Sequence, residues 1–540
     1  MIIKGNILNV YTDEVYPAEI RIEHGIIQSI KEVNKYFKDL IVPGFIDSHI
    51  HIESSLLTPS RFAEVALKHG TTSVVADPHE IANVMGMEGI EYMYEDAKHS
   101  PLNYYFTAPS CVPTTSFETA GGKINAHDID SLFDRDDFVA LGEVMDYPAV
   151  IAHDKKMMDK IKVAKKHDKP IDGHAPLLSG FDLQEYVKCG ISTDHECTTL
   201  KEAMEKKRQG MKIMIREGSE NHSLEALLHS GGDFLVSDDL KAEDLIEGHL
   251  DLSLRKAVDL GMDPFDAIKL VTCNPARHYG INAGAIAPGR KADLVFVDNL
   301  EDFNVKRVII NGNTIYKKQK LLYRANPKSV RNTINLKHRN ANDFDVKMPN
   351  PKANSAIVNV ISVNDDSIIT GTSTAKLNVE KGNVIPSVFE DVLKISVLDR
   401  YGRNTIANGF VRGFGIKNGA IASSVSHDSH NVIVVGTNGH YMAEAVNNIH
   451  KNKGGLVAVS ANETVDLPLP IAGLMSPDSA GSVAEKSNEL NEFVKNMGCN
   501  LRSPFTTLSF IALPVVPTLK MTNKGLFDVN KQEFIDVIKQ

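Results

Sequence analysis

The sequence has 540 residues, 42% hydrophobic and 24% charged, which is ordinary for a soluble globular protein but too long for one hydrophobic core, so we expect two or three domains. The formal net charge of −10 argues against a general nucleic-acid binder, because such proteins need a basic surface. Five scattered cysteines without C-x-x-C spacing, no apolar signal sequence and no membrane-length apolar run favour a soluble cytoplasmic protein.

Two separated stretches carry matching β patterns. Residues 1–40 alternate apolar and polar side chains around a turn near residues 23–25, which predicts a small antiparallel sheet. Residues 289–317 repeat this pattern around an Asn311–Gly312 turn. Because neither piece looks self-sufficient, we expect one composite β-sandwich domain formed by residues 1–42 and 285–335.

Between these stretches, strand-like and helix-like runs alternate. FAEVALKHG precedes TTSVVADPHE, and KIKVAKKHDKP precedes IDGHAP; in each pair the helix ends near Gly or Pro and a strand follows. About 240 residues of such units match the size and rhythm of a (β/α)8 barrel. A doubly wound sheet is the alternative. We favour the TIM-like barrel for residues 43–284 because polar residues cluster at the C-terminal ends of the strands, where that fold places its chemistry.

The last part of the chain predicts a separate domain. Residues 320–355 are polar, rich in Asn and without clear periodicity, so we interpret them as a connector. Strand-like runs then resume in SAIVNVIS, KISVLDR and NVIVVGTN, together with a helical AEAVNNIHK. We expect a mixed α/β domain over residues 355–540, of a type that the pattern does not define.

Candidate metal ligands follow the apolar runs of the predicted barrel. In IVPGFIDSHIHIESS, His49 and His51 lie two residues apart on a strand, so both side chains point the same way. Alone, an H-x-H pair is more often two ordinary histidines than a metal site. Four further strands end in polar ligands, and imidazoles with carboxylates suit a pair of divalent ions. The set expected at the barrel mouth is His49, His51, Glu143, His174, His195 and Asp238.

Eight sequence blocks span nearly the whole chain: PGFIDSHIHIESS, GTTSVVADPHEIANV, LGEVMDYP, DGHAP, TDHECTT, VSDD, SSVSHDSHN and LPLPIAGLMS. Together they resemble the bacterial adenine deaminases of the amidohydrolase superfamily, in which a composite β domain also occurs. The resemblance implies a hydrolase acting on C–N bonds in cyclic amidines, which converts adenine to hypoxanthine and ammonia in purine salvage and adenine catabolism. It implies two divalent ions, Mn²⁺ or Fe²⁺, although the ligands also permit Zn²⁺.

The resemblance also assigns the metal ligands. His49 and His51 would hold one ion, and His174 and His195 the other. Glu143 would bridge the two ions, in the place where hydantoinases and dihydroorotases use a carboxylated lysine.

The reaction also requires residues that transfer protons. Asp238 would ligate the first ion and carry a proton between the attacking hydroxide and adenine. The neighbouring Asp239 is an alternative ligand. Glu80 in ADPHE, with His79 beside it, lies at a strand end and could assist proton transfer, although ion pairing or helix capping would equally explain it.

Three residues of the last domain, His427, Asp428 and His430, are candidates for substrate binding. They could instead hold an additional ion or form a satisfied loop network. Two other functions compete with deamination: a cyclic-amide hydrolase of the hydantoinase or dihydroorotase type, and a non-catalytic metal-binding assembly subunit. We expect a small-molecule substrate, adenine, no nucleic-acid or membrane partner, and a homo-oligomer.

Overall fold

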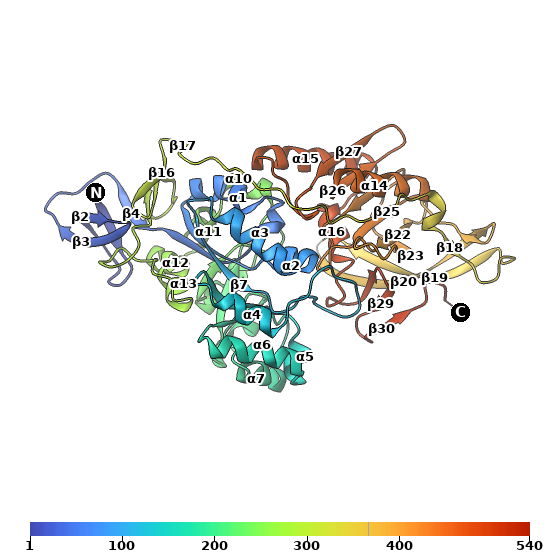
Figure 1. Cartoon of the computed structure of the whole chain (residues 1–540), viewed down its shortest axis with the longest axis horizontal. Coiled ribbons are helices and arrows are strands. Elements are labelled where there is room, and N and C mark those ends of the chain that lie inside the picture. The colour runs from blue at the N-terminus through green and yellow to red at the C-terminus, as the bar shows by residue number, and fades with distance from the viewer. Residues whose placement is uncertain (366, 540) are drawn as a thin grey trace. The chain divides into compact units, whose positions relative to one another are not determined.

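The computed structural model describes residues 1–365 and 367–539 and divides the chain into two compact units (Figure 1). Unit 1 comprises Met1–His79, Ile90–Cys111 and Ile124–Lys328, and unit 2 comprises Glu80–Gly89, Val112–Lys123 and Ser329–Gln540. Two short segments within the barrel sequence therefore belong to unit 2. The three-domain boundaries expected from the sequence stay a prediction.

Both flanks of the barrel sequence join in one eight-stranded sheet of unit 1. Its order is β17-β16-β15-β14-β4-β1-β2-β3, and the two flanks meet where β14 pairs antiparallel with β4. Alternating apolar residues such as Ile7, Ile20 and Leu294 fill its core. The strands are β1 (Ile2–Asn9), β2 (Glu14–Glu23), β3 (Ile26–Glu32), β4 (Leu40–Pro43), β14 (Leu294–Val297), β15 (Val305–Ile310), β16 (Asn313–Lys317) and β17 (Lys320–Leu321).

The rest of unit 1 is a closed barrel of parallel strands. Each of eight successive strands lies beside the next, although β9 and β10 form no ladder and are joined by an isolated bridge between Ile171 and Ile191, just before β10. After Ser237 the eighth strand continues as β13 (Asp238–Asp239), which pairs parallel with β5 and closes the ring. This closure excludes the doubly wound alternative. The strands are β5 (Phe45–His51), β6 (Thr71–Ala76), β7 (Asn103–Ala108), β8 (Phe138–Val144), β9 (Ile171–Gly173), β10 (Thr193–Asp194), β11 (Lys212–Arg216) and β12 (Phe234–Val236).

Helices alternate with these strands, and their ends follow local capping rules. Helix α6, for example, begins after Asp154, whose side chain accepts hydrogen bonds from the N–H groups of Lys156 and Met157. Its buried residues recur at helical spacing. The helices are α1 (Pro59–Ala66), α2 (His79–Met85), α3 (Met87–Ala97), α4 (Ala126–Phe133), α5 (Tyr147–Ile151), α6 (Lys155–Lys166), α7 (Gly180–Lys188), α8 (Leu200–Arg208), α9 (Leu224–Leu227), α10 (Ala242–Glu247), α11 (Leu250–Asp259), α12 (Pro264–Leu270) and α13 (Cys273–His278).

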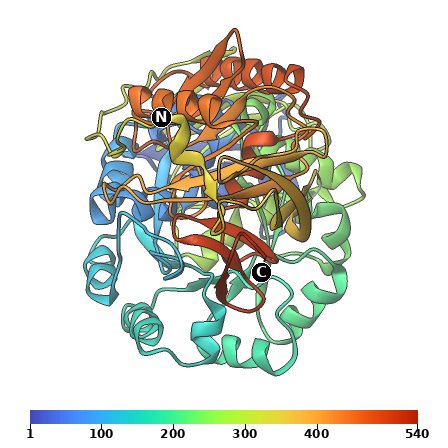
Figure 2. The same cartoon turned by 90° about the vertical axis from the view of Figure 1, so that its right-hand side faces the viewer.

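Unit 2 is built on a mixed ten-stranded sheet of order β18-β21-β20-β19-β23-β22-β25-β24-β26-β27. Its strands are drawn in yellow to red in Figure 2. Apolar residues of α14, including Met442 and Val446, pack on β24, β25 and β26. The strands are β18 (Val346–Lys347), β19 (Ser355–Asn364), β20 (Ser367–Glu380), β21 (Asn383–Val384), β22 (Val392–Leu398), β23 (Ile406–Arg412), β24 (Ala420–Ser423), β25 (Val432–Gly436), β26 (Gly455–Val459) and β27 (Thr464–Pro468).

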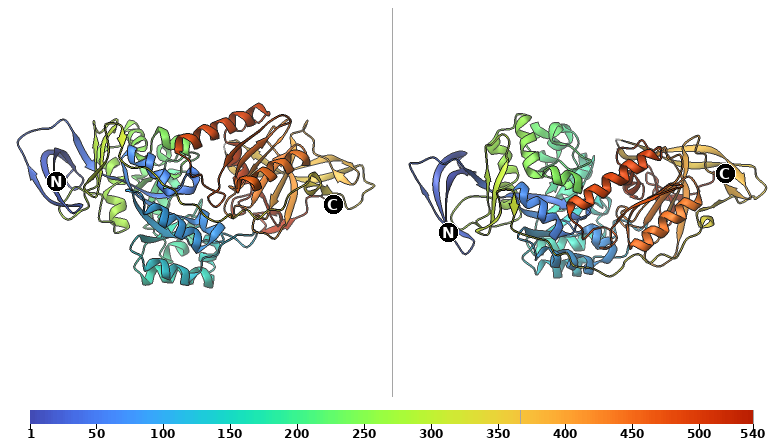
Figure 3. Two further views of the ribbon diagram at one scale, coloured as in Figure 1. Left: turned by 45° about the horizontal axis from the view of Figure 1, so that its top comes forward. Right: turned by 90° about the horizontal axis from the view of Figure 1, so that it is seen from above.

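Three helices and a small sheet complete unit 2. They are α14 (Gly439–Asn452), the long α15 (Ala480–Asn496), drawn in red in Figure 3, α16 (Pro504–Phe510), β28 (Leu519–Thr522), β29 (Gly525–Asp528) and β30 (Glu533–Ile535). No helix in the described part of the chain is both long and apolar enough to cross a membrane.

Candidate metal centre and active site

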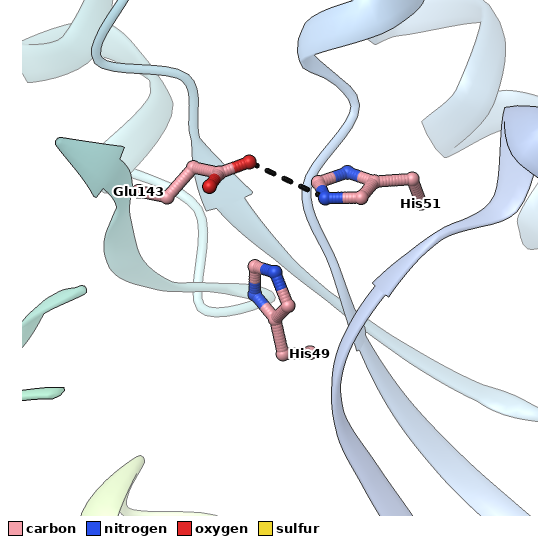
Figure 4. Close-up of side chains that lie close together, drawn as sticks. All are labelled: His49, His51 and Glu143. Atoms are coloured by element: carbon pink, nitrogen blue, oxygen red, sulfur yellow. Dashed lines mark ion pairs between the residues drawn. The ribbon is translucent and has the colours of Figure 1, made fainter. Parts of the chain in front are cut away.

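The six candidate ligands lie together at the C-terminal ends of the barrel strands. His49 and His51 end β5, Glu143 lies in β8, and the remaining three follow or belong to later strands. Figure 4 shows the two histidines of β5 turned toward Glu143. Five of the six are buried, whereas the side chain of His174 is 23% exposed and therefore lies on the solvent side of the cluster.

Glu143 faces two sets of histidines with its two carboxylate oxygens. Its Oε1 lies 3.3 Å from Nε2 of His51. Its Oε2 lies 2.8 Å from Nδ1 of His174 and 3.2 Å from Nε2 of His195. Burial opposes ionisation, yet hydrogen bonds from these histidines hold the pKa of Glu143 well below its ordinary value. A carboxylate with one oxygen toward each set is suited to bridging two cations.

Asp238 and its neighbour Asp239 make different contacts. Oδ1 of Asp238 is 3.4 Å from Nε2 of His49 and 3.2 Å from Nε2 of His51. The residue has a left-handed backbone, with φ of 61°, so the chain bends at this point instead of continuing as an extended strand. Asp239 instead accepts a hydrogen bond of 2.5 Å from the hydroxyl of Ser54.

The cluster fits divalent metal ions. The ligand atoms of three groups lie within 4.8 Å of one another: His49, His51 and Glu143; His49, His195 and Asp238; and Glu143, His174 and His195. Nε2 of His49 is buried and makes no hydrogen bond to any described residue, which is costly unless another group satisfies it. Imidazole nitrogens and carboxylate oxygens are ligands for Mn²⁺, Fe²⁺ and Zn²⁺ alike.

A buried arginine, which the sequence reasoning missed, completes the site. Arg216 ends β11, and its Nη1 donates to Oδ2 of Asp238 at 2.5 Å and to Oε1 of Glu196 at 2.6 Å. Burial opposes ionisation of Asp238, but the charge of Arg216 is the largest influence that holds its pKa well below the ordinary value. The available signal was the position of Arg216 directly after the apolar run IMI, where the other strands also carry site residues.

Sequence reasoning also missed a buried carboxylate that is hydrogen bonded to the backbone of one ligand and to the residue before another. The fully buried carboxylate of Asp47 on β5 accepts hydrogen bonds from the hydroxyl of Ser237 at 2.5 Å and from its N–H at 3.3 Å. It also accepts the N–H of His49 at 3.5 Å, and it contacts Nε2 of His249 at 2.8 Å. Asp47 therefore ties the strand that carries His49 to the residue before Asp238.

The other candidates divide between the units. In unit 1, Nδ1 of His79 lies 3.5 Å from Oε1 of Glu143. In unit 2, Nδ1 of His427 lies 2.7 Å from Oε1 of Glu80, and Nε2 of His430 is hydrogen bonded to Oε2 of the same carboxylate. Asp428 instead accepts the hydroxyl of Thr114 at 2.5 Å.

Comparison with known families covers both units. Residues 40–315 match the model described as "Amidohydrolase family", and residues 367–533 match "Adenine deaminase C-terminal domain". A curated adenine deaminase of Methanosphaera stadtmanae is 68% identical over 540 residues, which cover 100% of both chains. The chain belongs to the adenine deaminase family.

Relatives in this family come from archaea and from bacteria. An adenine deaminase of Methanothermobacter thermautotrophicus is 51% identical over 99% of this chain and 100% of its own. An adenine deaminase of the bacterium Borreliella burgdorferi is 41% identical over 99% of this chain and 99% of its own. Among solved structures, a β-aspartyl dipeptidase of Fervidobacterium islandicum AW-1 is 17% identical, with a TM-score of 0.46 over 60% of this chain and 97% of that chain.

Proposed function

We propose that this chain hydrolyses adenine to hypoxanthine and ammonia. The observation that carries the proposal is Glu143, whose two oxygens face separate histidine sets in a chain that matches adenine deaminases over its full length. Water attacks C6 of the purine, the C6–N6 bond breaks, and the amine leaves as ammonia after gaining a proton. Purine salvage and adenine catabolism in the cytoplasm, by a homo-oligomer, are part of the same proposal.

The proposed cofactor is a pair of divalent ions, Mn²⁺ or Fe²⁺, with Zn²⁺ as a third option. His49, His51 and Asp238 would hold one ion, His174 and His195 the other, and Glu143 both. When bound, two such ions lower the pKa of water toward neutrality and stabilise developing negative charge.

Asp238 is the proposed proton carrier. Its Oδ2 accepts a hydrogen bond from Arg216, so Oδ1, which faces His49 and His51, is the proposed acceptor of a proton from the attacking water. Asp238 then returns that proton to the purine ring or to the departing amine. Arg216 orients the carboxylate throughout. Glu80, which directly follows His79 in the chain, is the proposed second proton carrier.

The two competing functions are less well supported. A cyclic-amide hydrolase of the hydantoinase type bridges its ions with a modified lysine, and this chain offers Glu143 there. A non-catalytic assembly subunit has no need for the buried pair of Asp238 and Arg216. His427 and His430 contact Glu80, and Asp428 contacts Thr114, all within unit 2, and we propose no direct substrate contact for these three residues.

The test is ammonia release from adenine by protein loaded with Mn²⁺, Fe²⁺ or Zn²⁺, in parallel with hydantoin and dihydroorotate. We expect ammonia release from adenine and no hydrolysis of hydantoin or dihydroorotate. His49→Ala and His195→Ala should lose both bound metal and activity, whereas the exposed His153→Ala should keep both. Hydrolysis of either cyclic amide with no ammonia from adenine would overturn the proposal.

A further inference from the structure

Side chains of unit 1 hold the backbone at the end of β9, where the sheet gives it little support. In the described part of the chain, β9 and β10 form no ladder and are joined by an isolated bridge. Beyond that bridge, three successive backbone N–H groups donate to side-chain oxygens. These hydrogen bonds join Gly173 to Oγ1 of Thr193 at 3.2 Å, His174 to the hydroxyl of Tyr186 at 3.1 Å, and Ala175 to Oδ1 of Asp194 at 2.8 Å.

A buried ion pair holds the same strand end. Neither Lys206 of α8 nor Asp194 has any exposed surface, and Nζ of Lys206 lies 2.9 Å from Oδ2 of Asp194. Nζ also donates to the carbonyl of Ala175 at 2.6 Å, so the pair holds both the N–H and the carbonyl of that residue. Oδ2 of Asp194 accepts the N–H of Glu196 at 3.2 Å as well. The pair therefore fixes the backbone directly after His174 and on both sides of the next histidine ligand.

Tyr186 of α7 connects the backbone of His174 to that of the neighbouring strand. Its side chain is fully buried, and its hydroxyl accepts the N–H of His174 and donates to the carbonyl of Val144 at 2.8 Å. Val144 directly follows Glu143 on β8. One hydroxyl thus fixes the distance between the two backbones whose side chains, His174 and Glu143, meet at 2.8 Å.

We infer that Lys206, Asp194 and Tyr186 are positioning residues for the second metal ion, because they fix the backbone that carries its two histidine ligands. A metal site needs ligands held to within about 0.5 Å, and strand ends without a ladder do not achieve this by backbone pairing. Burial of an ion pair is costly unless further hydrogen bonds satisfy both partners, and here the backbone beside the ligands supplies them. The inference rests on the pair of ions in the proposed function.

The three side chains should affect one ion more than the other. In protein loaded with Mn²⁺ and titrated with a chelator, Lys206→Met, Asp194→Asn and Tyr186→Phe should bind one of two metal equivalents about tenfold to hundredfold more weakly than the parent, as loss of an orienting group does. The other equivalent should change little. Lys207→Met is the matched control on α8, because its Nζ donates to the carbonyl of Ser230, and it should bind both equivalents like the parent.

Tyr186→Phe separates positioning from folding, because it removes one hydroxyl and keeps the buried ring. It should melt nearly like the parent, and excess Mn²⁺ should restore most of its lost adenine turnover, since the ligands themselves are intact. Should Lys206→Met fail to fold, Tyr186→Phe and Asp194→Asn still decide.

Parent-like affinity for both equivalents in Tyr186→Phe and Asp194→Asn would overturn the inference. Equal weakening of both equivalents, or turnover of Tyr186→Phe that excess Mn²⁺ does not restore, would do the same. A parent protein that binds two equivalents but releases no ammonia from adenine would instead overturn the proposed function alone.

Discussion

At the scale of single residues, Asp238 and Asp239 are neighbours with different surroundings. Asp238 contacts His49 and His51 through one oxygen and Arg216 through the other, whereas Asp239 accepts from Ser54. Neighbouring side chains of an extended strand point to opposite faces, so these two are expected to diverge. They diverge, but the left-handed backbone at Asp238 is part of the reason.

Asp238→Asn should retain most of its bound metal and lose on the order of 10²-fold or more in kcat, because the amide keeps an oxygen ligand but accepts no proton. Asp239→Asn should lose far less. Metal stoichiometry and kcat measured in parallel on both variants check this expectation. An active Asp238→Asn beside an inactive Asp239→Asn would reverse the assignment, and activity in both would leave Glu80 as the carrier.

At the scale of elements, the closure of the barrel depends on a side chain as well as on backbone pairing. The described ladder joins the eighth strand to β5 only through the two residues of β13. Just before them, Asp47 accepts both the hydroxyl and the N–H of Ser237, and the hydroxyl of Thr71 lies 2.7 Å from Nδ1 of His249 on the far side of the network. The carboxylate thus supplies acceptors where the ladder is interrupted.

Asp47→Ala should weaken metal binding or activity about tenfold to hundredfold, the usual cost of removing a group that orients ligands. Asp47→Asn should lose less, because its amide oxygen still accepts an N–H. Chelator competition on the protein loaded with Mn²⁺ measures the affinity, with the exposed Asp266→Asn as control. Unchanged affinity and kcat in Asp47→Ala would show that β13 alone fixes the ligands.

At the scale of the whole molecule, stability also depends on a cationic side chain buried in unit 2. Lys520 in unit 2 has no exposed surface, and burial lowers its pKa to about 7. Its Nζ donates to the carbonyls of Ile368 at 2.9 Å and Phe510 at 3.0 Å. In the unfolded chain the same amine titrates near 10.4.

Between these two pKa values the unfolded chain binds more protons than the folded one, so stability should rise with pH from about 7 toward 10. The cost of burying the charged amine is fully present below pH 7 and amounts to at most about 5 kcal/mol, at 1.36 kcal/mol per pKa unit. Melting temperatures of the parent and of Lys520→Met from pH 6 to 10 test this. The rise should be smaller in the variant, and equal slopes would contradict it.

The sequence by itself determined the features that follow from local periodicity. The i and i+2 spacing places His49 and His51 on one side of a strand, and the alternation of apolar runs with helices predicts the barrel and puts polar residues at its mouth. The same reasoning predicted that two separated stretches form one β domain, and they share a single sheet. The strands and the direction of their side chains were predicted correctly because each depends on the spacing of residues close together in the chain.

Tertiary structure decided the contacts that join distant residues. Arg216 reaches Asp238 across 22 positions, Asp47 reaches Ser237 across 190, and Glu80 reaches His430 across 350. No local period encodes such pairs, because they depend on which strands become neighbours and on where the backbone bends. From the sequence alone, an acidic residue that could bridge two cations, one that helps to close a barrel and one that contacts two imidazoles cannot be told apart. Only the groups that surround each carboxylate in the folded protein distinguish these three roles.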